Sequence, residues 1–175
     1  MITMFIIIED KPEEQREAFE AVKRSLGKVV EAHDEYLPRN HPKSAWTMAL
    51  KPTDGKTDGT IVWIASNLAV YEMVVGMATG YFKKGVIGKV NVLTDLMFPA
   101  REGGKEEPNG LQVVAQCIES GLPVVVCSDT DHHDVQWLRP IFPLLEKAHP
   151  TGRIPVILDK KDWDKAVTSL ADASA

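Results

Sequence analysis

Short, unbroken runs of apolar residues, rich in β-branched side chains, alternate along this chain with stretches of helical periodicity. Of all the features of the sequence, this alternation most restricts the possible fold classes. Runs without a polar residue at every second position are typical of strands buried on both faces. We expect five such strands, at residues 5–8, 60–65, 90–93, 123–127 and 154–158. Strands that alternate with helices favour a parallel sheet covered by helices on both faces, with right-handed crossovers. The sequence therefore predicts a doubly wound α/β fold.

The helices between these strands are predicted from apolar stripes and from residues suited to helix ends. Pro12 fits the first turn of a helix that Gly27 ends, and Gly121 ends a later one. Pro140 and Pro143 should kink or shorten the helix that precedes the fifth strand. Helical stretches are expected at residues 12–26, 68–82, 111–120, 135–148 and 163–170.

A single domain is expected from the length and composition of the chain. Its 175 residues, 44% hydrophobic and 26% charged, suffice for one globular core. We assign residues 1–170 to this domain and residues 171–175 to a frayed tail. Residues 28–59 are rich in proline and glycine and interrupt the periodicity, so we interpret them as an insertion, with residues 28–32 as a candidate short strand.

Charge and hydropathy argue against several classes of partner. The net charge is -5 and no segment concentrates basic residues, so neither nucleic acid nor an anionic membrane surface is expected to bind. No apolar run approaches the roughly 18 residues of a membrane span. The first eight residues lack the pattern of a signal peptide. We therefore expect a cytoplasmic location, with Cys117 and Cys127 as buried free thiols.

Acidic residues follow the predicted strands directly. Glu9 and Asp10 come after the first strand, and Asp95 comes after the third. In an open parallel sheet, ligands bind outside the carboxyl ends of the strands, so these acids should converge. Converging carboxylates raise one another's pKa values unless a cation lies among them, and oxygen ligands favour magnesium, manganese or calcium over zinc. The sequence predicts a divalent-metal site there.

Five segments of the chain, in order, resemble the motifs of response-regulator receiver domains. They contain the first strand with its acidic pair, an aspartate followed by a proline, the turn that opens the third helix, a fourth strand that ends in a hydroxyl residue, and a fifth strand that ends in a lysine. These segments are residues 6–12, 92–99, 109–112, 122–128 and 156–160. The resemblance covers nearly all of the chain outside residues 28–59. It implies a flavodoxin-like sheet of five parallel strands in the order 2-1-3-4-5.

The same resemblance implies a role for each matched residue. Asp95 would accept a phosphoryl group as an aspartyl phosphate. Ser128 and Lys160 would contact the phosphoryl oxygens. Magnesium, or manganese in its place, would be held by Glu9, Asp10, Asp95 and the backbone carbonyl of Met97.

The implied function is a stand-alone response regulator. Its enzymatic activity would extend at most to phosphoryl transfer to its own aspartate and hydrolysis from it. Its partners would be a sensor kinase or phosphotransfer protein and a downstream target that reads the phosphorylated state. A homodimer is also compatible with this role.

Three positions depart from the family pattern and leave alternatives open. Asp129 follows Ser128 where a small residue is usual, and Ile157 takes the place of the switch aromatic. Lys161 stands where a proline normally follows Lys160, so either lysine could be the site lysine. These departures are compatible with a degenerate receiver that binds partners without being phosphorylated.

Two enzymatic alternatives rest on the segment after the fourth strand. Glu9 with Asp129 and Asp131 resembles a Toprim-type metal site, which would imply nucleic-acid chemistry. Asp131 with His132 and His133 resembles the Asp-His-His phosphoesterases. The simpler interpretation of the two histidines is a polar helix start that an aspartate caps.

Overall fold

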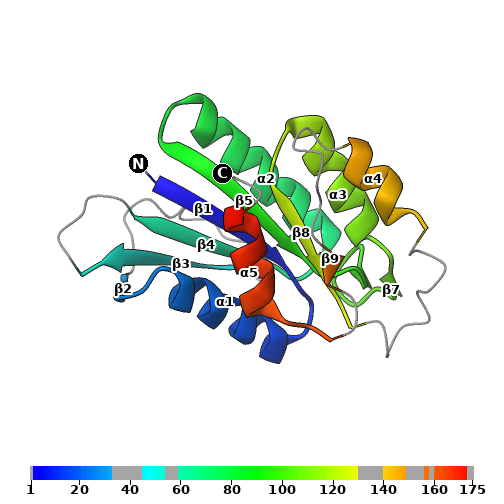
Figure 1. The fold of residues 1–175 in the computed structure, drawn as a ribbon, viewed down its shortest axis with the longest axis horizontal. Coiled ribbons are helices and arrows are strands. Elements are labelled where there is room, and N and C mark those ends of the chain that lie inside the picture. Colours follow the sequence, from blue (N-terminus) through cyan, green and yellow to red (C-terminus); the bar gives the residue numbers. More distant parts are fainter. Residues whose placement is uncertain are drawn as a thin grey trace.

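The computed structural model of this chain describes residues 2–32, 45–53, 59–129, 140–148, 156–157 and 160–172. A twisted sheet runs through the middle of the molecule and helices cover both of its faces (Figure 1). The strands are β1 (Ile2–Ile8), β2 (Val29–Ala32), β3 (Ala45–Pro52), β4 (Thr60–Ala65), β5 (Ile87–Thr94), β8 (Val124–Cys127) and β9 (Val156–Ile157). The helices are α1 (Pro12–Ser25), α2 (Leu68–Lys83), α3 (Gly110–Ser120), α4 (Phe142–Ala148) and α5 (Trp163–Asp172). A separate pair of short strands is formed by β6 (Phe98–Pro99) and β7 (Glu106–Glu107).

The sheet is mostly parallel, which confirms the predicted α/β class. Its seven strands lie in the order β2-β3-β4-β1-β5-β8-β9, so the prediction of five strands in the order 2-1-3-4-5 was wrong for the sheet as a whole. The difference comes from residues 28–59, because β2 and β3 add antiparallel strands beside β4. An edge strand exposes unpaired backbone N–H and C=O groups, and β3 satisfies those of β4.

Alternate residues of the central strands enter two different cores. Ile6 and Ile8 of β1 face α2, α3 and α4, whereas Phe5 and Ile7 face α1 and α5. The residues on both faces of β1 are buried, which explains why polar and apolar residues do not alternate along this strand. Figure 1 shows the two helical layers on opposite sides of the sheet.

Several element boundaries differ from the predicted ones. β5 begins at Ile87, and α4 begins at Phe142, which places Pro143 in its first turn, where the missing N–H costs no helical hydrogen bond. Residues 135–139 and most of the predicted fifth strand lie outside the described residues. Cys117 and Cys127 are buried free thiols, as predicted. Among the described helices, none is long and apolar enough to cross a membrane.

The start of α3 packs directly on the chain that leaves β5. A Cβ atom at Gly110 would lie 2.4 Å from the carbonyl oxygen of Asp95 and 2.7 Å from Cα of Leu96. The Gly110 N–H also donates a hydrogen bond to the Leu96 carbonyl, at 3.0 Å. Only glycine allows this close approach of the two backbones.

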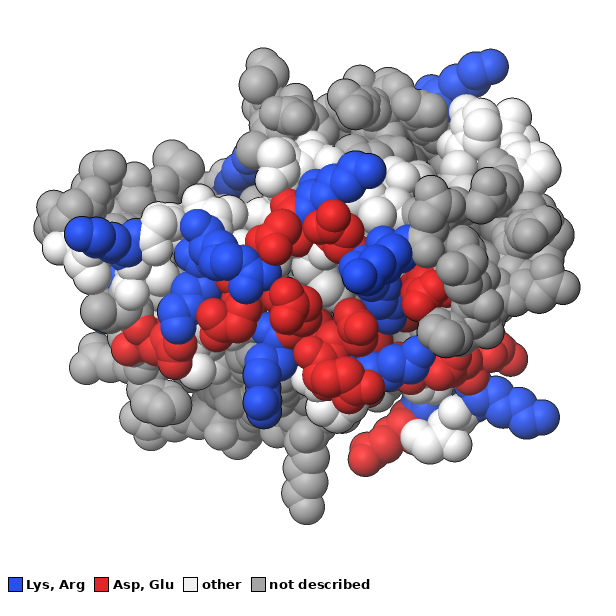
Figure 2. Space-filling view, turned by 60° about the horizontal axis from the view of Figure 1, so that its bottom comes forward, with Lys and Arg blue, Asp and Glu red and all other residues white. Residues whose placement is uncertain are grey.

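The outer surface of α1 and α5 is strongly charged, with acidic and basic side chains interleaved (Figure 2). Arg24 of α1 forms two hydrogen bonds with Asp164 of α5, at 2.9 and 2.8 Å, and one with Glu17, at 3.1 Å. We call these three residues the α1–α5 seam. Their side chains are 49–61% exposed.

Candidate functional site

Two acidic residues extend the central strands of the sheet and lie side by side. Glu9 follows β1 and donates its N–H to the Ala65 carbonyl at 3.0 Å, while Asp95 follows β5 and donates its N–H to the Ile8 carbonyl at 2.9 Å. The ladder of parallel hydrogen bonds thus continues one residue beyond each strand. Both side chains are fully buried. The backbone therefore fixes these two carboxylates at the carboxyl edge of the sheet, as the order of strands and acids predicts.

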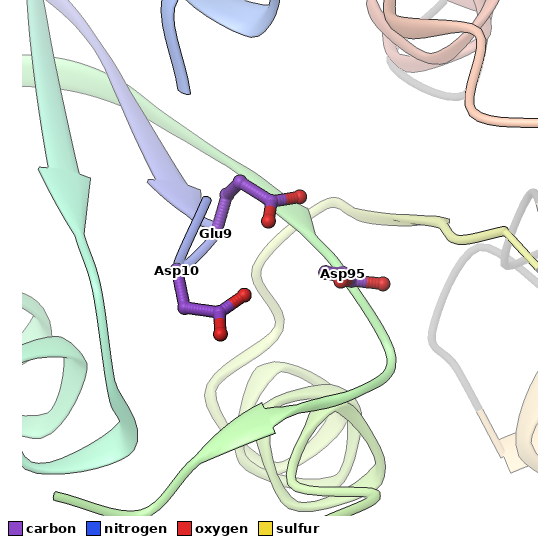
Figure 3. A group of neighbouring side chains, drawn as sticks. All are labelled: Glu9, Asp10 and Asp95. Atoms are coloured by element: carbon purple, nitrogen blue, oxygen red, sulfur yellow. The ribbon is translucent and has the colours of Figure 1, made fainter. Parts of the chain in front are cut away.

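Asp10 completes a group of three carboxylates. One oxygen from each of Glu9, Asp10 and Asp95 lies within 4.8 Å of the others, and Figure 3 shows the three side chains around a common space. Asp10 is half-buried, and its Oδ1 is enclosed with no hydrogen-bond partner among the described residues. A buried oxygen of this kind needs a partner, such as water or an ion.

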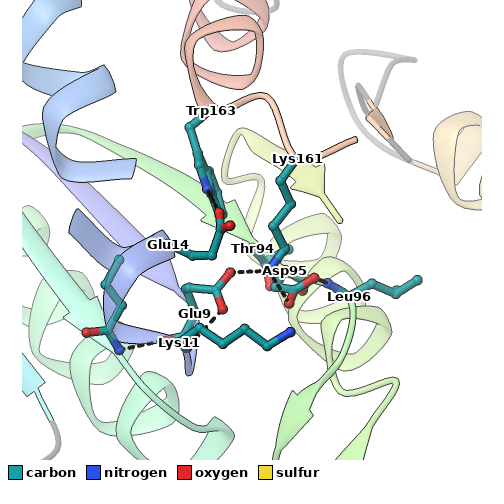
Figure 4. A network of polar contacts seen from close by, with 9 residues as sticks. Glu9, Lys11, Glu14, Thr94, Asp95, Leu96, Lys161 and Trp163 are labelled. Atoms are coloured by element: carbon teal, nitrogen blue, oxygen red, sulfur yellow. Dashed lines mark hydrogen bonds and ion pairs between the residues drawn. The ribbon is translucent and has the colours of Figure 1, made fainter. Parts of the chain in front are cut away.

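Lys161 places its ammonium group between two of these acids (Figure 4). Its Nζ lies 2.5 Å from Glu9 Oε2 and 2.8 Å from Asp95 Oδ2, and its side chain is only 7% exposed. The remaining oxygens are held by backbone donors. The Lys11 N–H donates to Glu9 Oε1 at 3.0 Å, and the Leu96 N–H donates to Asp95 Oδ1 at 2.6 Å.

The site has more negative than positive charge. With all three carboxylates ionised, the single ammonium of Lys161 would leave an excess of two negative charges. Burial, together with the charge of Asp95, raises the pKa of Glu9 to about 8 despite the nearby ammonium. Burial alone would lower the pKa of Lys161, but Asp95 and Glu9 more than offset it, so that this pKa is raised. A divalent cation would relieve the excess of negative charge.

The residues present fit a magnesium or manganese ion. All three side chains offer carboxylate oxygen, which hard divalent cations prefer. Glu9, Asp10 and Asp95 would hold the ion. Among the described residues, Asp10 Oδ1 has no hydrogen-bond partner, so it is open to a metal ion. Met97, whose carbonyl was the fourth predicted ligand, lies two residues after Asp95 and is half-buried.

Ser128 lies at the end of the neighbouring strand. It follows β8, which pairs with β5, and its N–H donates to the Ile157 carbonyl at 2.8 Å. The residue is fully buried, and its Oγ has no hydrogen-bond partner within the described part of the chain. This hydroxyl is therefore available to a ligand at the carboxyl edge of the sheet.

Of the two candidate lysines, it is Lys161 that contacts the acids. Lys160 is exposed. The sequence offered no signal to choose between adjacent lysines, because the choice depends on how the chain turns before α5. Asp131, His132 and His133 lie outside the described residues, so the alternatives based on them remain predictions.

Two side chains that support the site were not predicted. Gln15 of α1 donates from Nε2 to the Glu9 carbonyl at 2.7 Å, and the Thr94 hydroxyl donates to the Asp95 carbonyl at 2.6 Å. Both bonds hold the backbone of an acidic residue. Their sequence signals, a glutamine in a first helical turn and a threonine at a strand end, are too common to be informative.

Comparison of the chain with protein-family models and with curated proteins gives no match. The assignment of a function therefore depends on the geometry of the site and on the motifs in the sequence.

Proposed function

We propose that this chain is a receiver-like signalling domain of the cytoplasm, in which Asp95 accepts a phosphoryl group in a magnesium-dependent reaction. A sensor kinase or phosphotransfer protein would supply the phosphoryl group, and a target protein would bind the phosphorylated form. The observation that carries the proposal is the convergence of Glu9, Asp10 and Asp95, with one oxygen of each within 4.8 Å of the others.

The arrangement of the parallel strands also supports the proposal. Without the two antiparallel strands, the sheet reads β4-β1-β5-β8-β9, which is the receiver-like order 2-1-3-4-5. In that order, the acidic pair, the acceptor aspartate, the hydroxyl residue and the lysine follow neighbouring strands. Residues so placed would surround one phosphoryl group.

The chemistry assigned to each residue follows from its contacts. In transfer from acetyl phosphate, the bond between phosphorus and the acetyl oxygen breaks, acetate leaves with the electron pair, and Asp95 forms the new oxygen–phosphorus bond. The metal ion, when bound, offsets charge between the carboxylate and the phosphoryl oxygens. Lys161 would pair with one phosphoryl oxygen, and the Ser128 hydroxyl, which has no partner among the described residues, would donate to another.

Beryllofluoride binding tests this proposal, because this anion mimics a phosphoryl group on a carboxylate. We expect saturable binding in the presence of magnesium, measured by fluorine NMR, and a mass increase of one phosphoryl group after incubation with acetyl phosphate. Both signals should disappear in Asp95→Asn and after chelation of the metal. The exposed acid Glu13 offers a matched control, since Glu13→Gln should behave like the wild type. Wild-type protein that gives neither signal at any magnesium concentration would contradict the proposal.

A degenerate receiver is the second candidate, and the position of Lys161 favours it. The ammonium lies on both Glu9 and Asp95, where it competes with a metal ion for the same oxygens. A site kept in this state would act only as a scaffold for partner binding. In that case Asp95→Asn would leave partner binding unchanged.

A further inference from the structure

Lys161 lies two residues before the start of α5. It lies between β9 and α5, outside both elements, and its neighbour Lys160 is exposed. Trp163, the first residue of α5, lies two positions further on and is 2% exposed. A long lysine side chain has many rotamers, so its position on the acids depends on how firmly its backbone is anchored. Trp163 is one such anchor, and Asp162 beside it accepts hydrogen bonds from the N–H groups of Lys165 and Ala166 in α5.

The Trp163 side chain forms a specific bond to α1. Its indole Nε1–H donates to Glu14 Oε2 at 2.9 Å, and Figure 4 shows this pair beside the acidic site. The bond is charge-assisted and partly buried, so it is stronger than a neutral hydrogen bond at the surface. Its ring meanwhile packs in the core beneath α1 and α5. The start of α5 is therefore fixed to the first turn of α1.

That same first turn is attached to Glu9. The Lys11 N–H donates to Glu9 Oε1, and Gln15 donates to the Glu9 carbonyl. The contacts thus form a closed ring, which passes from Glu9 to Lys161, along the chain to Trp163, across to Glu14, and back along α1 to Glu9. The bond between Trp163 and Glu14 joins α5 to α1 without touching any of the three carboxylates of the site.

We propose that Glu14 and Trp163 are positioning residues that hold Lys161 on Glu9 and so set the balance between metal binding and phosphoryl transfer. This inference rests on the proposed function. Lys161 opposes metal binding while it occupies oxygens of Glu9 and Asp95, but it is needed to neutralise an incoming phosphoryl group. Loosening Lys161 should therefore strengthen one process and weaken the other.

Three substitutions separate this role from general packing. Trp163→Phe keeps an aromatic ring in the core but removes the N–H donor together with part of the ring volume, so Glu14→Leu is needed to test the same bond without a cavity at position 163. Glu14→Leu removes the acceptor at similar size, whereas Glu14→Gln keeps an acceptor oxygen and should restore wild-type behaviour. For Trp163→Phe and Glu14→Leu we expect magnesium to bind about threefold more tightly by calorimetry, and acetyl phosphate to react about tenfold more slowly at saturating magnesium. The double variant should add nothing to either single one.

A matched control comes from the α1–α5 seam. Arg24→Ala also removes contacts with the first turn of α5, through Asp164, but its side chain is exposed and no contact among the described residues joins it to Glu9 or Lys161, so it should change neither quantity. A parallel decrease of metal affinity and rate, failure of Glu14→Gln to restore them, or the same effect from Arg24→Ala would overturn the inference.

A metal-free measurement separates this inference from the proposed function. The ammonium signal of Lys161 in nitrogen-15 NMR should be visible at neutral pH in the wild type and in Glu14→Gln, because the buried ion pair slows proton exchange. The signal should broaden beyond detection in Trp163→Phe. Unchanged signals in Trp163→Phe would refute the positioning role, whereas the absence of magnesium and beryllofluoride binding in the wild type would refute the phosphoacceptor function alone.

Discussion

Two ion-pair groups in this molecule have similar geometry and opposite surroundings. In the α1–α5 seam, Arg24 lies 2.8 Å from Asp164 and 3.1 Å from Glu17, and all three side chains are 49–61% exposed. At the carboxyl edge of the sheet, Lys161 lies 2.5 and 2.8 Å from two carboxylates that are fully buried. Water screens the first group and cannot compensate the second. Distance alone therefore says little about what an ion pair contributes, and burial decides it.

Removal of Lys161 should have the largest effect. Lys161→Met leaves Glu9 and Asp95 buried without their cation, and we expect the free energy of unfolding to fall by about 4 kcal/mol. Urea denaturation of the metal-free protein measures this change. Lys160→Met is the matched control, because Lys160 is exposed and should alter stability by less than about 0.5 kcal/mol. Equal effects of the two substitutions would contradict the contrast between the regions.

The pH dependence of stability should distinguish the two regions next. The folded protein raises the pKa of Glu9 from 4.5 to about 8, so it binds a proton more tightly than the unfolded chain does. Stability should therefore fall as the pH rises from about 4.5 to 8, by up to about 4 kcal/mol in the metal-free protein. Thermal unfolding in the presence of a chelator tests this. Glu9→Gln should flatten the curve, and a curve that rises over this range would show that the sign is wrong.

Asp10 should matter for the metal more than for the fold. Its Oδ1 has no protein partner among the described residues, so Asp10→Asn should weaken magnesium binding about tenfold, equivalent to about 1.4 kcal/mol. Calorimetric titration measures the dissociation constant, with Glu13→Gln as an exposed control. An unchanged dissociation constant would remove Asp10 from the set of ligands.

The exposed seam should give the smallest effect. Arg24→Ala is expected to lower the free energy of unfolding by less than about 1 kcal/mol, and added salt should reduce even this difference. Denaturation at low and high ionic strength checks both statements. A loss as large as that for Lys161→Met would mean that burial is not what separates the two groups.

The central strands and the acids that follow them could be predicted because local pattern determines both. An apolar run such as β1 is buried on both faces only in a sheet that has helices on both sides. Parallel strands also bring their carboxyl ends to one edge of the sheet. The candidate strand at residues 28–32 is confirmed as β2, but β3 was not predicted, because its pairing with β2 and β4 depends on contacts between distant residues rather than on periodicity. The choice between Lys160 and Lys161 depended likewise on the turn before α5.

The backbone contact at Gly110 also has a mechanical consequence. With no side chain in between, the first turn of α3 rests on the peptide group of Asp95, and neither can shift without moving the other. A displacement of the aspartate is therefore passed to the helix as a rigid-body motion instead of being absorbed by side-chain rearrangement. Glycine at position 110 thus couples the position of α3 directly to the backbone of Asp95.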